Sequence, residues 1–225
     1  MKNILVINLK RFGDIICSAN LINNLKNKYP RSKISLLVYE CSVNATKVLP
    51  NIHEVYTINR EEVLMYLKNK LFPDTVALQS FIDDLTGVKN ERWDSIINYS
   101  NDKLSSILIS YLNPEYFYGV KTNENNLIEY SNEWAVQFNE VLTSRDTVPV
   151  NVIESLHKTC DIEMEDKNNK LLSNQDFNKI TYKNFNDLRK KYQTPETPHV
   201  SVVGIQVKTS SVKKDIPLDQ MVDLI

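Results

Sequence analysis

Short apolar runs alternate with helical stripes along the first 120 residues, and this alternation constrains the fold more than any other feature. Residues 3–8 and residues 34–38 are continuous runs rich in β-branched side chains. Such runs are typical of strands that are covered on both faces of a parallel sheet. We expect three further strands, at residues 54–58, 93–99 and 116–120.

The segments between these strands have the spacing of amphipathic helices. The first stripe ends before Pro30 and consists of Ile15, Ala19, Ile22, Leu25 and Tyr29. Shorter helices are predicted at residues 42–49, 61–71 and 104–112. Most of residues 127–160 is also predicted to be helical. Residues 73–90 are predicted to be a variable stretch. Strands and helices in alternation predict an α/β fold, a doubly wound and Rossmann-like parallel sheet with right-handed crossovers.

Composition changes after residue 160. Residues 161–198 are dominated by Asn, Asp, Lys, Gln and Thr, which is typical of a domain boundary, with one helix expected near residues 184–191. A new strand opens at residues 199–207, but one strand and half a helix cannot form a core. We therefore expect an N-terminal domain at residues 1–160, a polar connector at 161–198, and the incomplete start of a second Rossmann-like domain at 199–225.

Bulk properties exclude several classes of protein. The net charge of −1 argues against a nucleic-acid binder, and four glycines cannot supply the glycine-rich loop of a dinucleotide-binding dehydrogenase. No apolar run is long enough to span a membrane, and nothing resembles the core of a signal peptide. We expect a cytoplasmic protein, with peripheral contact to the inner membrane surface left open.

The cysteines and histidines show no metal-binding spacing, so no metal site is expected. Cys17, Cys41 and Cys160 are predicted to be buried small side chains of a protein in a reducing compartment. The histidines are predicted to be structural: His53 and His199 at strand edges, and His157 on a helix surface.

Two polar loops are expected at the carboxyl edge of a sheet, where open α/β folds bind their ligands. The first contains Lys10, Arg11, Gly13 and Asp14. Gly13 permits a tight turn or the close approach of a ligand. Asp14 is either the N-cap of the following helix or a general base that faces a cleft. Lys10 and Arg11 either contact an anionic substrate or are solvated surface charges.

The second loop, residues 208–217, contains three hydroxyl groups and three lysines and precedes a predicted helix. Free amides, the helix dipole and ammonium groups together favour a diphosphate. An ordinary polar loop has the same composition, so both interpretations stay open.

The order of these segments resembles glycosyltransferase family 9, which includes the heptosyltransferases. Members open with an apolar strand, a Leu-Gly-Asp-type turn and an aliphatic pair, which appear here as Phe12-Gly13-Asp14-Ile15-Ile16. Later family features have counterparts in Leu49-Pro50-Asn51, Trp93-Asp94-Ser95-Ile96-Ile97, Tyr118-Gly119-Val120, Thr209-Ser210 and Lys214-Asp215-Ile216-Pro217.

The resemblance implies a two-domain GT-B fold that transfers a heptose or similar sugar from a nucleotide-diphosphate sugar, such as ADP-heptose. The acceptor would be the core of lipopolysaccharide or another glycan or glycolipid, and the reaction would be inverting, with no metal and no cofactor. Asp14 would remove the proton of the acceptor hydroxyl beside the cleft loop of Lys10, Arg11 and Gly13. Thr209, Ser210 and Lys214 would stabilise the departing diphosphate.

The sequence departs from the family pattern in three respects. Ile216 replaces the usual Trp, Lys208 stands where many members have Gly, and the later donor-binding elements would lie beyond residue 225. The alternative hypothesis is therefore a truncated, non-catalytic α/β remnant or binding module of the same family. A periplasmic-type ligand binder is a third hypothesis, against which the absence of an export signal argues.

Overall fold

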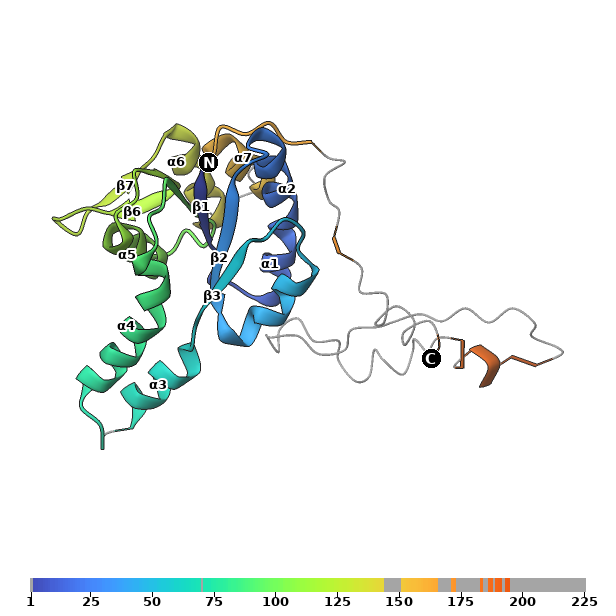
Figure 1. The fold of residues 1–225 in the computed structure, drawn as a ribbon, viewed down its shortest axis with the longest axis horizontal. Coiled ribbons are helices and arrows are strands. Elements are labelled where there is room, and N and C mark those ends of the chain that lie inside the picture. The colour runs from blue at the N-terminus through green and yellow to red at the C-terminus, as the bar shows by residue number, and fades with distance from the viewer. Residues whose placement is uncertain are drawn as a thin grey trace. The chain divides into compact units, whose positions relative to one another are not determined.

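A parallel five-stranded sheet forms the centre of the first structural unit, Met1–Leu172 (Figure 1). The structure is a computed structural model, and it describes residues 2–69, 71–143 (backbone only for 141–143), 151–165, 171–172, 183, 186–187, 189–191 and 193–194. The strand order is β3-β2-β1-β4-β5, and all four pairings are parallel. The strands are β1 (Asn3–Ile7), β2 (Lys33–Tyr39), β3 (Glu54–Ile58), β4 (Ser95–Asn98) and β5 (Tyr116–Tyr118). The predicted doubly wound parallel sheet is confirmed.

Helices cover both faces of this sheet, which explains the continuous apolar character of its strands. One face packs against α1 (Phe12–Cys17), α2 (Ala19–Lys28), the 3-10 helix η1 (Glu40–Val48), α6 (Glu133–Thr143) and α7 (Val152–Thr159). The other face packs against α4 (Asp74–Asn90) and α5 (Lys103–Leu112). Figure 1 shows α1 and α2 on one side of the strands and α4 and α5 on the other.

Successive residues of a strand enter different cores, as the pleat requires. In β2, Leu36 belongs to the core under α1 and α2, while Leu37 belongs to the core under α4 and α5, and neither side chain is exposed. The two layers are therefore built from alternating positions of the same strands.

Several predicted helices have different bounds in the structure. The first stripe is divided between α1 and α2 at Ser18, whose hydroxyl donates to the carbonyl of Ile15 at 2.6 Å. Such bonding of a side chain to the preceding turn competes with the helix, which explains the break. The predicted helix at residues 42–49 is the 3-10 helix η1, and the predicted helix at 61–71 is α3 (Arg60–Lys68).

Three other predictions differ from the structure. Residues 73–90 do not form a variable stretch, because Asp74–Asn90 is the 17-residue helix α4. The predicted strand at residues 116–120 ends at Tyr118, because Gly119 adopts a φ of +104° and turns the chain out of the sheet. Within residues 127–160, which read as mostly helical, Ile128–Tyr130 is the strand β7. It pairs with β6 (Val120–Thr122) to form an antiparallel hairpin.

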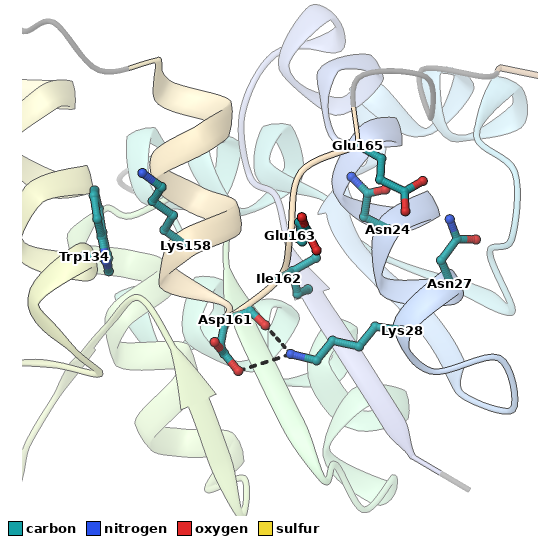
Figure 2. A pocket seen from close by; sticks show the side chains of 9 residues that line it. All are labelled: Asn24, Asn27, Lys28, Trp134, Lys158, Asp161, Ile162, Glu163 and Glu165. Atoms are coloured by element: carbon teal, nitrogen blue, oxygen red, sulfur yellow. Dashed lines mark hydrogen bonds and ion pairs between the residues drawn. The ribbon is translucent and has the colours of Figure 1, made fainter.

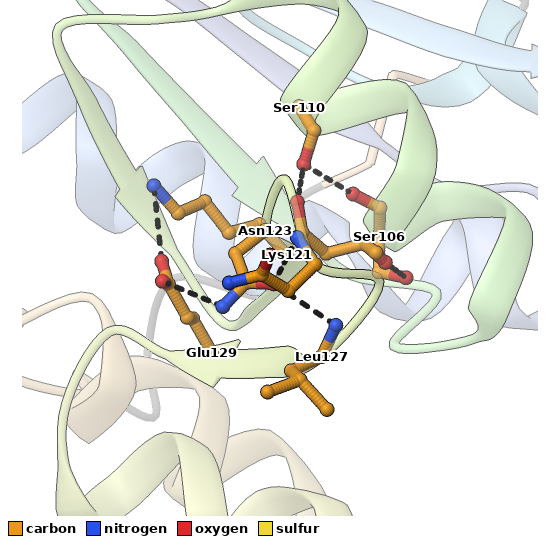
Figure 3. Close-up of polar contacts among 8 residues, drawn as sticks. Ser106, Ser110, Lys121, Asn123, Leu127 and Glu129 are labelled. Carbon is orange, nitrogen blue, oxygen red and sulfur yellow. Dashed lines mark hydrogen bonds and ion pairs between the residues drawn. The ribbon is translucent and has the colours of Figure 1, made fainter.

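Hydrogen bonds connect this hairpin to α5 (Figure 3). The Ser106 hydroxyl lies 2.8 Å from that of Thr122, and the Ser110 hydroxyl donates to the Thr122 carbonyl. Across the hairpin, Lys121 and Glu129 form an ion pair at 3.2 Å. The hairpin is therefore a fixed part of the unit even though it lies outside the main sheet.

Candidate functional site

The sheet changes its direction of winding between β1 and β4. The chain steps outward from β1 through β2 to β3 and then returns to add β4 on the other side of β1. In such sheets the crevice beyond the carboxyl ends of the two strands is the usual place for a ligand. The segments at this edge of the sheet are residues 8–14, after β1, and residues 99–102, after β4.

Hydrogen bonds join these two segments into one rim. The Leu9 amide donates to the Ser100 hydroxyl at 2.6 Å. The amides of Tyr99 and Ser100 both donate to the carbonyl of Ile7, at 3.0 and 3.2 Å. Since Leu9 and Ser100 are both buried, this link holds the two loops at a fixed separation.

Asp14 lies at this rim, but it is not the N-cap of α1. The N-cap is Arg11, and Asp14 occupies the third helical position. From there its Oδ2 accepts a hydrogen bond from the Arg11 amide at 3.2 Å. The amide of the Asn8 side chain donates to the Asp14 carbonyl at 3.2 Å. Asp14 is half-buried, and these two hydrogen bonds fix the turn that carries it.

The other predicted residues of the first loop surround Asp14. Lys10 is half-buried, whereas Arg11 and Gly13 are exposed. A Cβ atom added to Gly13 would meet no atom within 4 Å, so the space above this position is open. These neighbours in the chain follow β1 and enter the first turn of α1, and their roles in binding or catalysis stay predictions.

Two tyrosines near the ends of β2 and β4 have raised pKa values. Burial raises the pKa of Tyr99, and the charges of Cys17 and Asp14 add to this effect. Burial likewise raises the pKa of Tyr39 at the end of β2. The charge of Asp102 raises the pKa of Tyr39 further and that of Arg60 lowers it. Both phenols therefore stay neutral near neutral pH.

The loop after β4 was not predicted as part of the site. Asp102 caps α5 by accepting from the Ser105 amide at 2.8 Å, and Asn101 adopts a φ of +53°. The side-chain oxygens of Asn8 and Asn101 are buried and have no hydrogen-bond partner. Strand order was the missing signal, because only the adjacency of β4 to β1 brings residues 99–102 to the crevice.

The predicted donor-phosphate residues Thr209, Ser210 and Lys214 lie outside the described residues, as does the whole segment 195–225. The predicted connector and the start of a second domain are therefore still predictions. Within the described part of the chain, no three His, Cys, Asp or Glu side chains gather as a metal-binding group. No described helix is both long and apolar enough to cross a bilayer.

Two pockets lie away from the rim. An apolar groove of about 350 Å³ runs between α3 and α4 and reaches Tyr39 and Ile58 at the carboxyl ends of β2 and β3. A polar pocket of about 740 Å³ lies between the C-terminal ends of α2 and α7 (Figure 2). There Lys28 binds Asp161 at 3.2 Å, and Lys158 lies 4.3 Å from the centre of the Trp134 ring. Because its cations are already engaged, the polar pocket offers no free anion site.

His157 was wrongly predicted to lie on a helix surface, since its side chain is fully buried. One ring nitrogen lies 2.7 Å from the Ile153 carbonyl and the other 3.1 Å from the amide nitrogen of Asn24. Burial lowers the pKa of His157, although backbone hydrogen bonds oppose this effect. His157 therefore joins α7 to α2 as a neutral ring. His53, by contrast, is exposed directly before β3.

The cysteine prediction was correct for one residue. Cys160 is buried under α7, and burial raises the pKa of its thiol. Cys17 and Cys41 are exposed, because they occupy the solvent sides of α1 and η1, where the sequence pattern of such short helices is weak.

Comparisons with known proteins point to one group of enzymes. No family model matches the chain. The chain is 24% identical over 143 residues to lipopolysaccharide heptosyltransferase 3 of Escherichia coli, which covers 64% of this chain and 37% of that protein. A glycosyl transferase family 9 structure from Veillonella parvula superposes with a TM-score of 0.61 at 13% identity, covering 99% of this chain and 58% of that one.

A third match is weaker. E. coli heptosyltransferase WaaC with ADP gives a TM-score of 0.48 at 11% identity, covering 73% of this chain and 49% of that one. The chain spans 37% of the length of the curated relative and 58% of the length of the Veillonella structure. The chain is similar in sequence to a lipopolysaccharide heptosyltransferase and has the fold of a family 9 glycosyl transferase.

Proposed function

We propose that this chain forms the acceptor side of a glycosyltransferase that moves a heptose or a similar sugar from a nucleotide-diphosphate sugar to a glycan. The observation that carries the proposal is the placement of Asp14. A half-buried carboxylate stands at the switch point of a sheet whose fold is that of a family 9 glycosyl transferase. A carboxylate in such a crevice suits a general base.

In the proposed reaction, the acceptor hydroxyl lies beside Asp14 and gives up its proton to the carboxylate. The acceptor oxygen then forms a bond to the anomeric carbon as the bond to the diphosphate breaks, with inversion and without a metal. Lys10 and Arg11 supply positive charge beside the base, which suits an acceptor that carries anionic groups. The core of lipopolysaccharide is the acceptor that the E. coli relative's name suggests.

The donor side of the proposal rests on Thr209, Ser210 and Lys214. Hydroxyl and ammonium groups of this kind stabilise the charge that develops on a departing diphosphate. ADP-heptose is the donor that the family resemblance implies, and a cytoplasmic location would give the enzyme access to it.

The test is a substitution of Asp14 by Asn in the natural full-length protein. Initial rates of ADP release from ADP-heptose, with a core-oligosaccharide acceptor, should fall by about 10²- to 10⁴-fold, the usual contribution of a general base. Calorimetric binding of ADP should be unchanged, because Asp14 is placed on the acceptor side. Glu124→Gln, an exposed carboxylate in the β6–β7 hairpin, is the matched control and should keep the wild-type rate.

Normal turnover by Asp14→Asn would remove Asp14 as the base. If the wild-type protein neither binds ADP nor transfers sugar from any nucleotide-sugar offered, the alternative of a non-catalytic binding module replaces the transferase.

A further inference from the structure

Asn8 is the first residue after β1, and it continues the sheet by one position. Its backbone amide donates to the Leu37 carbonyl of β2 at 2.9 Å. Successive residues of β1 point to opposite faces, and Ile4 and Val6 belong to the apolar layer under α1 and α2. Asn8 falls in the same row as these two residues and is fully buried. It is therefore a polar side chain at the end of an apolar row, on the face that carries α1.

The side chain of Asn8 reaches across the loop to α1. Its amide nitrogen donates to the carbonyl of Asp14 at 3.2 Å. In a regular α-helix that carbonyl would accept from the amide four positions later, which is that of Ser18. The Ser18 amide donates to the Ile15 carbonyl instead, at 3.1 Å, because α1 ends there. Asn8 therefore supplies a bond to the Asp14 carbonyl that the helix does not supply through Ser18.

The start of α1 has little other support from buried side chains. Residues 10–13 are exposed or half-buried, and Ile15 is the buried residue of α1. The helix has six residues, too few to be stable on its own. The bond from Asn8 is therefore a direct link between the end of β1, which the sheet holds in place, and the first turn of α1.

The carboxylate of Asp14 depends on the same turn. Its Oδ2 accepts from the Arg11 amide at 3.2 Å, so the orientation of the carboxylate follows that of the turn. The sheet, Asn8, the first turn of α1 and the carboxylate thus form one chain of contacts. A displacement of α1 relative to β1 would therefore displace the carboxylate.

The stability of the core does not account for an asparagine at position 8. The side-chain oxygen of Asn8 is buried and has no hydrogen-bond partner among the described residues. A buried polar atom without a partner costs free energy, and an apolar side chain of similar volume, such as leucine, would avoid that cost. The gain from Asn8 therefore lies in its bond to Asp14.

From these contacts we propose that Asn8 is a positioning residue, which holds the Asp14 carboxylate at the rim by tying the first turn of α1 to the end of β1. The inference rests on the proposed function, since it requires Asp14 to be the base. Without the bond, α1 shifts against the sheet and the carboxylate leaves the place where the acceptor hydroxyl gives up its proton. A misplacement of about 1 Å lowers a rate by up to about 10²-fold.

The first experiment is kinetic and uses the natural full-length protein with ADP-heptose and a core-oligosaccharide acceptor. Asn8→Leu should lower kcat by about 10- to 10²-fold. KM for ADP-heptose should stay at the wild-type value, because Asp14 is placed on the acceptor side. The thermal midpoint should match or exceed that of the wild type, because leucine removes the unpartnered oxygen. An asparagine with a merely structural role would not give a lower kcat at undiminished stability.

Hydrogen exchange tests the link between β1 and α1 without any sugar transfer. In the same full-length protein, the amides of residues 15–18 should exchange about 2- to 12-fold faster in Asn8→Leu than in the wild type, the effect of losing one hydrogen bond. Exchange in α5, on the other face of the sheet, should be unchanged.

Two further variants complete the design. Asn23→Leu is the matched control, because Asn23 is a buried asparagine of α2 whose side-chain oxygen accepts from Asn51 at 2.9 Å. It should keep the wild-type kcat whatever its effect on stability. Asn8→Ala removes the same bond to Asp14 without adding a branched side chain and should give the same loss of kcat, so it replaces Asn8→Leu if leucine prevents folding.

The results separate this inference from the proposed function. Wild-type kcat in both Asn8 variants, or unchanged exchange at residues 15–18, would overturn the inference while Asp14 remained the base. An equal loss of kcat in Asn23→Leu would also overturn it, since any buried asparagine would then matter as much. If the wild-type protein transfers no sugar, the proposed function fails and the inference fails with it, even where exchange changes.

Discussion

The pKa of His157 depends on its position in the fold. It is fully buried between α7 and α2, and burial lowers its pKa from the ordinary value of 6.5. Sequence could not show this, because a histidine in a short helix is usually at the surface and the partner, Asn24, is 133 positions away in the chain. The contact between His157 and Asn24 forms only when the chain folds, so it could not be predicted from local sequence.

We predict that His157 makes the protein less stable in acid. Between its folded and unfolded pKa values, the unfolded chain binds a proton that the folded chain does not, so the free energy of unfolding falls as pH falls. The loss should begin near pH 6.5, the ordinary pKa, and grow below it. Urea unfolding of wild type and His157→Gln across this range should show a smaller pH slope in the variant.

His53→Gln is the control for this measurement, because His53 is exposed and should leave the pH slope unchanged. Equal slopes in the wild type and His157→Gln would contradict the prediction.

Individual elements differ in how far the sequence could predict them. β1, β2 and β3 were predicted within one residue at each end. β1 and β2 lie inside the covered sheet and have continuous apolar sequences, whereas β3 is an edge strand whose sequence alternates. α4 was missed, because with three buried positions in 17 residues it needs no clear apolar stripe. A helix supported mainly by its neighbour α3 cannot be recognised from its own periodicity.

The site was predicted in the same uneven way. Lys10, Arg11, Gly13 and Asp14 follow directly after the first strand, so their position at the carboxyl edge could be read from local sequence. Ser100 could not, because its bond to Leu9 spans 91 positions and depends on strand order.

Gly119 offers a test at the level of elements, because it separates β5 from β6. Its φ is +104°, and an added Cβ would lie 3.0 Å from the Cβ of Asn98 and 3.2 Å from the Asn98 carbonyl oxygen. We expect Gly119→Ala to reduce the free energy of unfolding by about 1–3 kcal/mol, from strain and from that close contact.

Gly13→Ala is the matched control. Gly13 lies within α1, where an added Cβ meets no atom within 4 Å, so alanine should raise helix stability by up to about 1 kcal/mol. Chemical denaturation measures the free energy of unfolding of both variants. If Gly13→Ala lowered this free energy as much as Gly119→Ala does, the steric explanation would be contradicted.

For the whole molecule, the sheet is covered on both faces by separate apolar layers. Leu36 and Leu37 are neighbours in β2, both without exposed area, and each belongs to a different layer. We predict that Leu36→Ala and Leu37→Ala each lower the free energy of unfolding by about 2–5 kcal/mol, as fully buried leucines do.

The control is Ile107→Ala on α5, where the isoleucine is 43% exposed. It should lower the free energy of unfolding far less than either leucine substitution. Guanidinium unfolding gives all three values. A small decrease in the free energy of unfolding for either leucine variant would mean that the corresponding face of the sheet is open rather than covered.

The position of β1 affects how the chain can fold while it is being made. β1 is synthesised before both of its partners, and it pairs on one side with β2 and on the other with β4, where Ile4 faces Ser95. At about 5–20 residues per second, a ribosome needs about 5–18 s to add the intervening segment. During that interval the nascent chain presents an apolar strand with one unpaired edge, which is the form in which strands bind other strands. Chaperones that cover nascent apolar segments should therefore engage this chain until β4 has emerged.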